Sequence, residues 1–122
     1  ERLHMLRIEF KKLRYTVEYF QEVLGRRSFE VIETIKVLQD HLGDLNDAQV
    51  ATQILGDFIA GYEKEAEDAP ISERESLAEV VSYMAYRHAE RHRLLTTFHE
   101  VWSAQFDQKR FRRRVAQAVA LL

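Results

Sequence analysis

The chain has 122 residues, 46% of them hydrophobic, which suits one domain spanning residues 1–122 with an ordinary core. Its 18 basic and 20 acidic residues give a net charge of −2, so it is not expected to coat nucleic acids. The absence of cysteine excludes disulfides and thiolate zinc sites, and no apolar run reaches the roughly 18 residues of a membrane span. Because the chain starts at Glu1 inside a motif, we expect it to be part of a longer protein.

The first predicted helix covers residues 2–24 and ends at Gly25, a residue suited to a helix C-terminus. Apolar residues recur along one side at steps of three and four: Leu3, Leu6, Phe10, Leu13, Val17, Phe20 and Leu24. A second row on another side consists of His4, Arg7, Lys11 and Arg14 and is followed by Glu18. Each residue turns a helix by about 100°, so these four nitrogen-bearing side chains share about 80° of arc. We call His4, Arg7, Lys11 and Arg14 the basic row.

Two interpretations of the basic row remain open from the pattern alone. It is either a solvated face, as most charged helix surfaces are, or a binding surface for a polyanion. From His4 to Arg14 a helix rises about 15 Å, a length that suits a chain of phosphates better than a single one. Arginine and lysine both bind phosphate oxygens well, and the Tyr15 hydroxyl is expected beside the row.

The middle of the chain is predicted to form two helices separated by a turn. Ser28 is the expected N-cap of a helix that runs to about residue 42, where Gly43 would stop it. Residues 44–47 would form the turn, and a third helix would cover 47–66 before the break at Pro70.

A fourth helix is predicted over 72–105, beginning at a capping box formed by Ser72 and Glu75. Its apolar seam is expected to contain Leu77, Val81, Met84, His88, Arg91, Leu95, Phe98 and Trp102. Because His88 and Arg91 are polar, they should pair with acids, mark a bend or face a polar cavity. Phe106 and Asp107 offer a break and a cap before a C-terminal helix over about 108–121, within an extension spanning 106–122.

Catalytic and metal chemistry are not expected from this sequence. His88 and His92 have a spacing that metal sites use, but Glu90 is not placed to complete a zinc-protease motif. We find no phosphate-binding glycine loop, nucleophile motif or magnesium-type acidic cluster, so we predict a non-enzymatic protein without a cofactor.

Two sequence blocks together resemble the CHAD family, the conserved histidine α-helical domain. The first is Leu3-His4-x-x-Arg7-Ile8-x-x-Lys11-Lys12-Leu13-Arg14-Tyr15-x-x-Glu18, and the second is Leu38-Gln39-Asp40-x-Leu42-Gly43-x-Leu45-Asn46-Asp47. The resemblance runs to about residue 105 and corresponds to the C-terminal half of a domain built from two facing helical halves. It implies binding of inorganic polyphosphate in a basic channel, without catalysis. It also implies that Lys36 and basic residues of the fourth predicted helix contribute to the site.

We therefore predict an all-α protein, an antiparallel four-helix up-down bundle with an additional C-terminal helix, forming half of a two-bundle CHAD-like domain. The predicted function is polyphosphate binding by the basic row, and the partner expected besides the ligand is the other helical half of the parent chain. The secondary candidates for the site are Lys12, Tyr15, Lys36, His88 and Arg91. Phosphates favour a charged His4, so binding should tighten from about pH 8 to 6.

One alternative function stays open, namely a helical interaction module. In it, the basic rows would pair with acidic partner proteins or with a second copy in a homodimer. The expected location is the cytoplasm, in association with polyphosphate granules.

Overall fold

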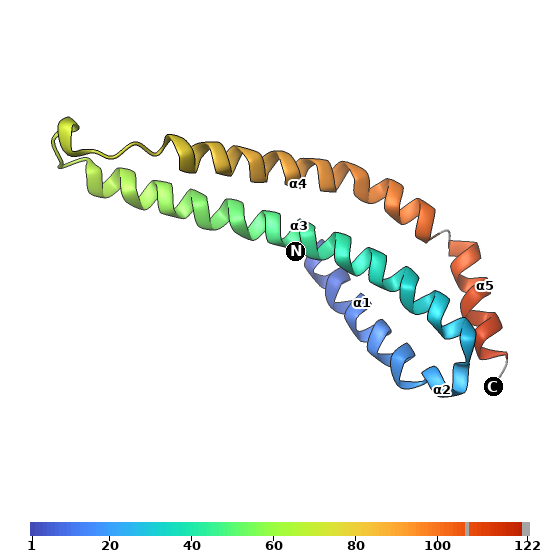
Figure 1. Cartoon of the computed structure of the whole chain (residues 1–122). Coiled ribbons are helices and arrows are strands. Elements are labelled where there is room, and N and C mark those ends of the chain that lie inside the picture. The colour runs from blue at the N-terminus through green and yellow to red at the C-terminus, as the bar shows by residue number, and fades with distance from the viewer. Residues whose placement is uncertain (107, 121–122) are drawn as a thin grey trace. The chain divides into compact units, whose positions relative to one another are not determined.

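The computed structural model describes residues 1–106 and 108–120. In this part of the chain all regular structure is helical, which confirms the predicted all-α class (Figure 1). The elements in order are α1 (Arg2–Tyr19), α2 (Gln21–Leu24), α3 (Arg26–Ala66), a 3-10 turn η1 (Ile71–Glu73), α4 (Ala78–Gln105) and α5 (Gln108–Val119). The predicted cap Asp107 and the predicted helix end at residue 121 lie outside the described residues.

The contacts of the chain fall into two compact units that share α3 and α4. Unit 1 comprises residues 1–44 and the chain from Thr96 onward, and unit 2 comprises Leu45–Leu95.

The core of unit 1 forms where α1 packs along the first part of α3 (Figure 1). Phe10 of α1 is buried with four residues of α3: Val31, Ile35, Leu38 and Leu42. The Phe10 ring meets Trp102 and Phe106 edge-on, with ring centroids 6.0 and 5.2 Å apart. Phe10 and Val17 of the predicted stripe face this mixed aliphatic and aromatic core, as the sequence pattern predicts, whereas Leu13 and Phe20 of the same stripe are exposed.

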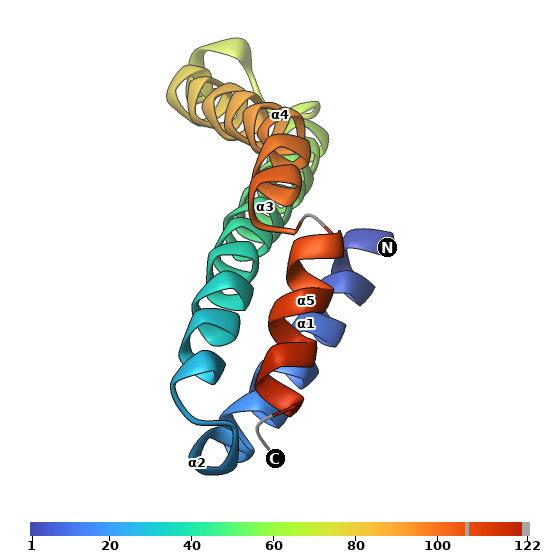
Figure 2. The same cartoon turned by 90° about the vertical axis from the view of Figure 1, so that its right-hand side faces the viewer.

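Helix α5 belongs to the same core (Figure 2). Its Phe111 stacks on Phe106 with ring centroids 4.2 Å apart. Farther along, Arg27 Nη1 donates to the Gln117 carbonyl at 3.4 Å. These contacts join α5 to the beginning of α3.

The predicted stop at Gly43 and the turn at 44–47 are wrong, because α3 is one helix of 41 residues. A glycine inside a helix costs only about 1 kcal/mol. Next to it, Leu42, Leu45 and Ala48 are buried, and each large apolar side chain contributes about 1.5–3 kcal/mol. Packing therefore outweighs the preference of glycine. Since the second and third predicted helices are continuous, the four-helix up-down arrangement is not confirmed.

The helix ends of unit 1 also differ from the predicted ones. α1 ends at Tyr19, and the short α2 leads to Gly25, whose positive φ of 67° agrees with a glycine at a helix end. Ser28 is not an N-cap, because α3 already begins at Arg26. Its buried hydroxyl instead donates to the Gly25 carbonyl at 2.6 Å and fastens the first turn of α3.

Unit 2 is a hairpin made of the second part of α3 and the first part of α4 (Figure 1). The Tyr62 hydroxyl accepts from the Glu75 N–H at 2.6 Å and lies 3.1 Å from the Glu75 carbonyl. Arg74 donates to the carbonyls of Ala69 and Glu67, each at 3.2 Å. These hydrogen bonds stabilise the conformation of the segment that connects α3 to α4.

The start and the seam of α4 are displaced from their predicted positions. The helix begins at Ala78, whose N–H donates to Ser76 Oγ at 3.3 Å, so the capping box at Ser72 is not formed. Val81 and His88 are exposed, whereas Val80, Met84, Arg87, Arg91 and Leu94 are half-buried or buried. None of the helices in the described ranges combines the length and the apolarity that crossing a membrane requires.

Candidate functional site

The basic row runs along α1 beside the face that packs on the core of unit 1, and three of its four members are exposed. His4, Arg7 and Lys11 are exposed, while Phe10 is buried and Val17 packs against the core. Among the residues that the structure describes, no acidic side chain forms an ion pair with these three cationic or imidazole groups. These three exposed groups extend along about 10 Å of helix, and Arg14 continues the row to about 15 Å.

Tyr15 lies beside the basic row, as expected from its position on α1. Its side chain is half exposed, and Lys11 Nζ lies 5.8 Å from the centre of its ring. This is a cation–π distance, so the ring limits the positions that the ammonium group adopts.

Arg14 differs from the rest of the row because it contacts a second helix. It follows Phe10 by four residues, or about 40° around the helix, and so borders the buried face. Its Nε donates to Glu18 Oε1 at 2.8 Å, and its Nη1 donates to Gln39 Oε1 of α3 at 3.2 Å. The side chains of Arg14 and Glu18 are each 33% exposed. One row member is thus held in place between α1 and α3.

The electrostatic surroundings of Arg14 keep its charge in place. The hydrogen bond to Glu18 raises the pKa of Arg14 above its ordinary value, and partial burial opposes this more weakly. The charge of Glu18 and the nearby Tyr15 and Asp40 raise the pKa further. Arg14 is therefore fully ionised at physiological pH, although the same acids reduce the net positive potential at this end of the row.

Lys12 and Lys36 are both engaged by acids of their own helices. Lys12 Nζ lies 2.8 Å from Glu9 Oε1, and Lys36 Nζ lies 3.0 Å from Glu33 Oε1. Exposed pairs of this kind contribute about 0–1 kcal/mol, so a polyanion can replace them at little cost. Lys36 stands one turn before Gln39 and therefore lies on the side of α3 that contacts Arg14.

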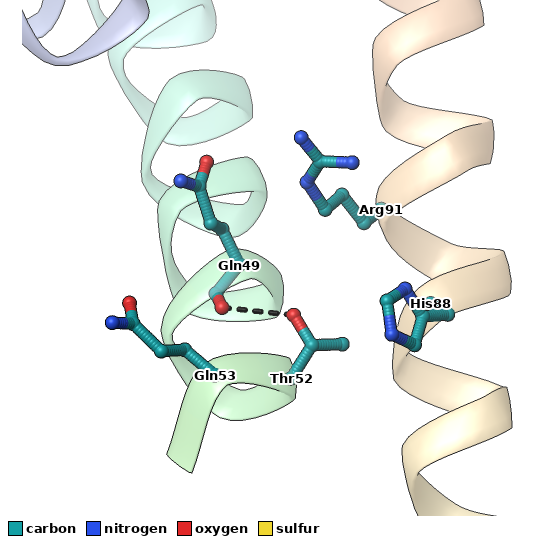
Figure 3. A pocket seen from close by; sticks show the side chains of 5 residues that line it. All are labelled: Gln49, Thr52, Gln53, His88 and Arg91. Carbon is teal, nitrogen blue, oxygen red and sulfur yellow. Dashed lines mark hydrogen bonds between the residues drawn. The ribbon is translucent and has the colours of Figure 1, made fainter. Parts of the chain in front are cut away.

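His88 and Arg91 line a pocket of about 260 Å³ inside unit 2 (Figure 3). They extend from α4 toward Gln49, Thr52 and Gln53 of α3. The Thr52 hydroxyl hydrogen is used by the carbonyls of Ala48 and Gln49, at 3.0 and 2.8 Å, so this group offers the pocket only lone pairs. The structure leaves His88 exposed and Arg91 half-buried at this open pocket, so it does not single out one of the alternatives for them. It places these two residues in a different unit from the basic row.

Sequence reasoning missed the residues that hold the arginines. Gln39 contacts Arg14 across 25 positions of sequence, which no local pattern reveals. Glu18 follows Arg14 by four residues, and this spacing was the available signal for a pair. In unit 2, Arg87 Nη1 donates to Glu90 Oε2 at 2.8 Å, and both side chains are about four-fifths buried. The buried Arg87 Nε has no hydrogen-bond partner in the described part of the chain.

The chemistry available at the basic row is electrostatic attraction combined with hydrogen-bond donation. Arg7 and Lys11 offer donors to an oxyanion, and Arg14 offers the donors that Glu18 and Gln39 leave unused. Within the described residues, no group of three or more histidine, cysteine, aspartate or glutamate side chains lies close enough to hold a metal ion.

Comparison with known proteins gives one match. The model of the CHAD domain family matches residues 1–56, and no curated protein and no solved structure matches the chain. The matched range contains both sequence blocks and the whole basic row, with Gln39 as well. It ends inside α3, short of residue 105 where the resemblance was expected to end. The resemblance that the two blocks predicted is therefore confirmed over residues 1–56, which match the CHAD domain family.

Proposed function

We propose that the chain binds inorganic polyphosphate, without catalysis, along the basic row of α1. The observation that carries this proposal is the row itself: three exposed cationic or imidazole groups without acidic partners among the described residues, continued by the oriented guanidinium of Arg14. The CHAD match supports it, because that family is commonly linked to polyphosphate binding.

Binding in this proposal is driven by counterion release. A polyphosphate chain lying along α1 exchanges its bound cations for Arg7, Lys11 and Arg14, so log affinity falls as log salt rises, by analogy with nucleic acids. The length of the row, about 15 Å, favours a polymer over a single phosphate. Lys36 adds charge from α3 once the ligand displaces Glu33.

We further propose that the other helical half of the parent chain completes a channel over the basic row. His88 and Arg91 are secondary contacts in this proposal, reached through their own pocket in unit 2. We place this function in the cytoplasm, in association with polyphosphate granules.

The test is titration of long-chain polyphosphate into the 122-residue chain by calorimetry at two salt concentrations. The double variant Arg7→Ala, Lys11→Ala should remove most binding, because both side chains are exposed and neither supports the core. The matched control, Lys64→Ala with Arg112→Ala, removes the same charge from exposed positions elsewhere and should bind nearly as the wild type. An equal loss of polyphosphate affinity in the two double variants would indicate that the overall charge of the protein, and not a defined site, attracts the ligand.

A helical interaction module remains the second candidate, since apolar side chains are exposed just beyond the basic row. Tyr19 is 83% exposed and Val23 is 59% exposed. A protein partner with acidic and apolar groups, or a second copy of the chain, would match such a surface. Competition distinguishes the candidates: a polyphosphate site should prefer polyphosphate over DNA of equal charge, and an interaction face should bind neither.

A further inference from the structure

The inference concerns the two residues that hold Arg14, and it rests on the proposed function of the basic row. We propose that Glu18 and Gln39 are positioning residues for the polyanion, because they hold the Arg14 guanidinium in the orientation in which it meets the ligand. They act through Arg14 and do not themselves supply positive charge.

The hydrogen bonds of Arg14 leave a defined set of donors for a ligand. A guanidinium has five N–H groups. Glu18 accepts the one on Nε at 2.8 Å, and Gln39 accepts one on Nη1 at 3.2 Å. The second Nη1 hydrogen and both Nη2 hydrogens remain as donors for the oxygens of a phosphate.

Two effects of Glu18 on affinity oppose each other, and their sizes differ. Its negative charge repels a polyanion, by about fivefold in affinity for two unit charges about 4 Å apart in water, and salt reduces this repulsion. Its hydrogen bond spares the ligand the cost of ordering a long side chain, which corresponds to about two- to tenfold in affinity. At a salt concentration that screens this repulsion, the positioning effect is the larger one, and the acid beside the basic row then strengthens the binding of an anion.

A variant of Gln39 tests the orientation of Arg14 apart from charge, because the Gln39 side chain is neutral. It belongs to the second sequence block, whereas Arg14 and Glu18 belong to the first. The hydrogen bond between Arg14 and Gln39 links the two blocks directly, in addition to the packing of Phe10 on Leu38 and Leu42. Removing it should loosen Arg14 without changing the electrostatic attraction.

The experiment compares three alanine variants in the full 122-residue chain. Calorimetry gives the Kd for long-chain polyphosphate, and circular dichroism gives helicity and Tm. Glu18→Ala should weaken binding about two- to tenfold even though it removes a negative charge. Gln39→Ala should weaken it in the same direction. Glu9→Ala is the matched control, because Glu9 is an acid of α1 paired with Lys12, and it should tighten binding by less than about twofold.

Two further readouts guard against a purely structural explanation. Glu18→Gln keeps an oxygen that accepts from Arg14 Nε, so it should restore wild-type affinity or exceed it. Exchange of the Arg14 Nε–H with solvent, followed by NMR, should be slower than that of Arg7 in the wild type and should accelerate in Glu18→Ala.

Tighter binding by Glu18→Ala, equal to that of Glu9→Ala, would overturn the positioning role while leaving polyphosphate binding in place. A wild-type chain that binds no polyphosphate would overturn both proposals. If Glu18→Ala loses helicity, Gln39→Ala and Glu18→Gln decide the question, and unchanged affinity in Gln39→Ala would count against positioning.

Discussion

Replacing Gly43 by alanine should stabilise the protein, contrary to what its place in a predicted turn suggests. Gly43 lies inside the continuous helix α3, and among the described residues only Gly25 has a positive φ. A Cβ atom built on Gly43 meets nothing within 4 Å. The variant therefore gains the difference in helix propensity, about 0.8–1.0 kcal/mol, without a steric cost. For a chain of this size that is a rise in Tm of about 3–6 °C.

Two other glycines supply the controls for this experiment. Gly56→Ala lies in the same helix with the same open surroundings, so it should give a gain of similar size. Gly25→Ala should cost about 1–3 kcal/mol, because φ 67° and ψ −157° form a region that side chains avoid. Thermal unfolding followed by circular dichroism at 222 nm measures all three variants on one scale.

A loss of stability or helicity in Gly43→Ala would refute the continuous helix and restore the predicted turn. A gain in stability together with weaker polyphosphate binding would have a different meaning. It would show that the motif glycine leaves room for a ligand or for the other half of the parent chain.

Three further changes test the core, the buried ion pair and the basic row. Phe10→Ala should lower the free energy of unfolding by about 3–5 kcal/mol, because Phe10 is 95% buried and its ring contacts aromatic neighbours. A loss below about 1 kcal/mol in urea denaturation would contradict that packing. Glu90→Ala should cost about 1–3 kcal/mol by the same assay, since it leaves Arg87, whose side chain is about four-fifths buried, without its acid, whereas Glu79→Ala at an exposed position should be nearly neutral. Polyphosphate affinity of the wild type should rise from about pH 8 to 6, and His4→Ala should flatten this rise. The same dependence of affinity on pH in the variant would remove His4 from the site.

The features that the sequence predicted well are those set by local periodicity. The stripe containing Phe10 and Val17 faces the core, and the row from His4 to Lys11 faces solvent, because a helix turns each residue by a constant angle. Gly25 was placed correctly at a helix end, because the backbone there needs a positive φ.

The features that it did not predict depend on contacts between distant segments. The buried Leu42 and Leu45 carry the helix through Gly43, and that packing energy is invisible in a local window. In α4, Val80 and Val81 are equally apolar, so the pattern could not tell which one begins the half-buried seam. The Arg14–Gln39 bond joins two helices and appears only once they are packed.

The unbroken course of α3 has a consequence for how the chain folds. Starting a helix is costly, whereas adding a residue to an existing one is cheap. A helix begun in unit 1, where Ile35 and Leu38 are fully buried, therefore extends into unit 2 without a second nucleation step. Amide hydrogen exchange should accordingly show protection that declines gradually from the middle of α3 toward Ala66, and the end of the family match at residue 56 should leave no mark on it.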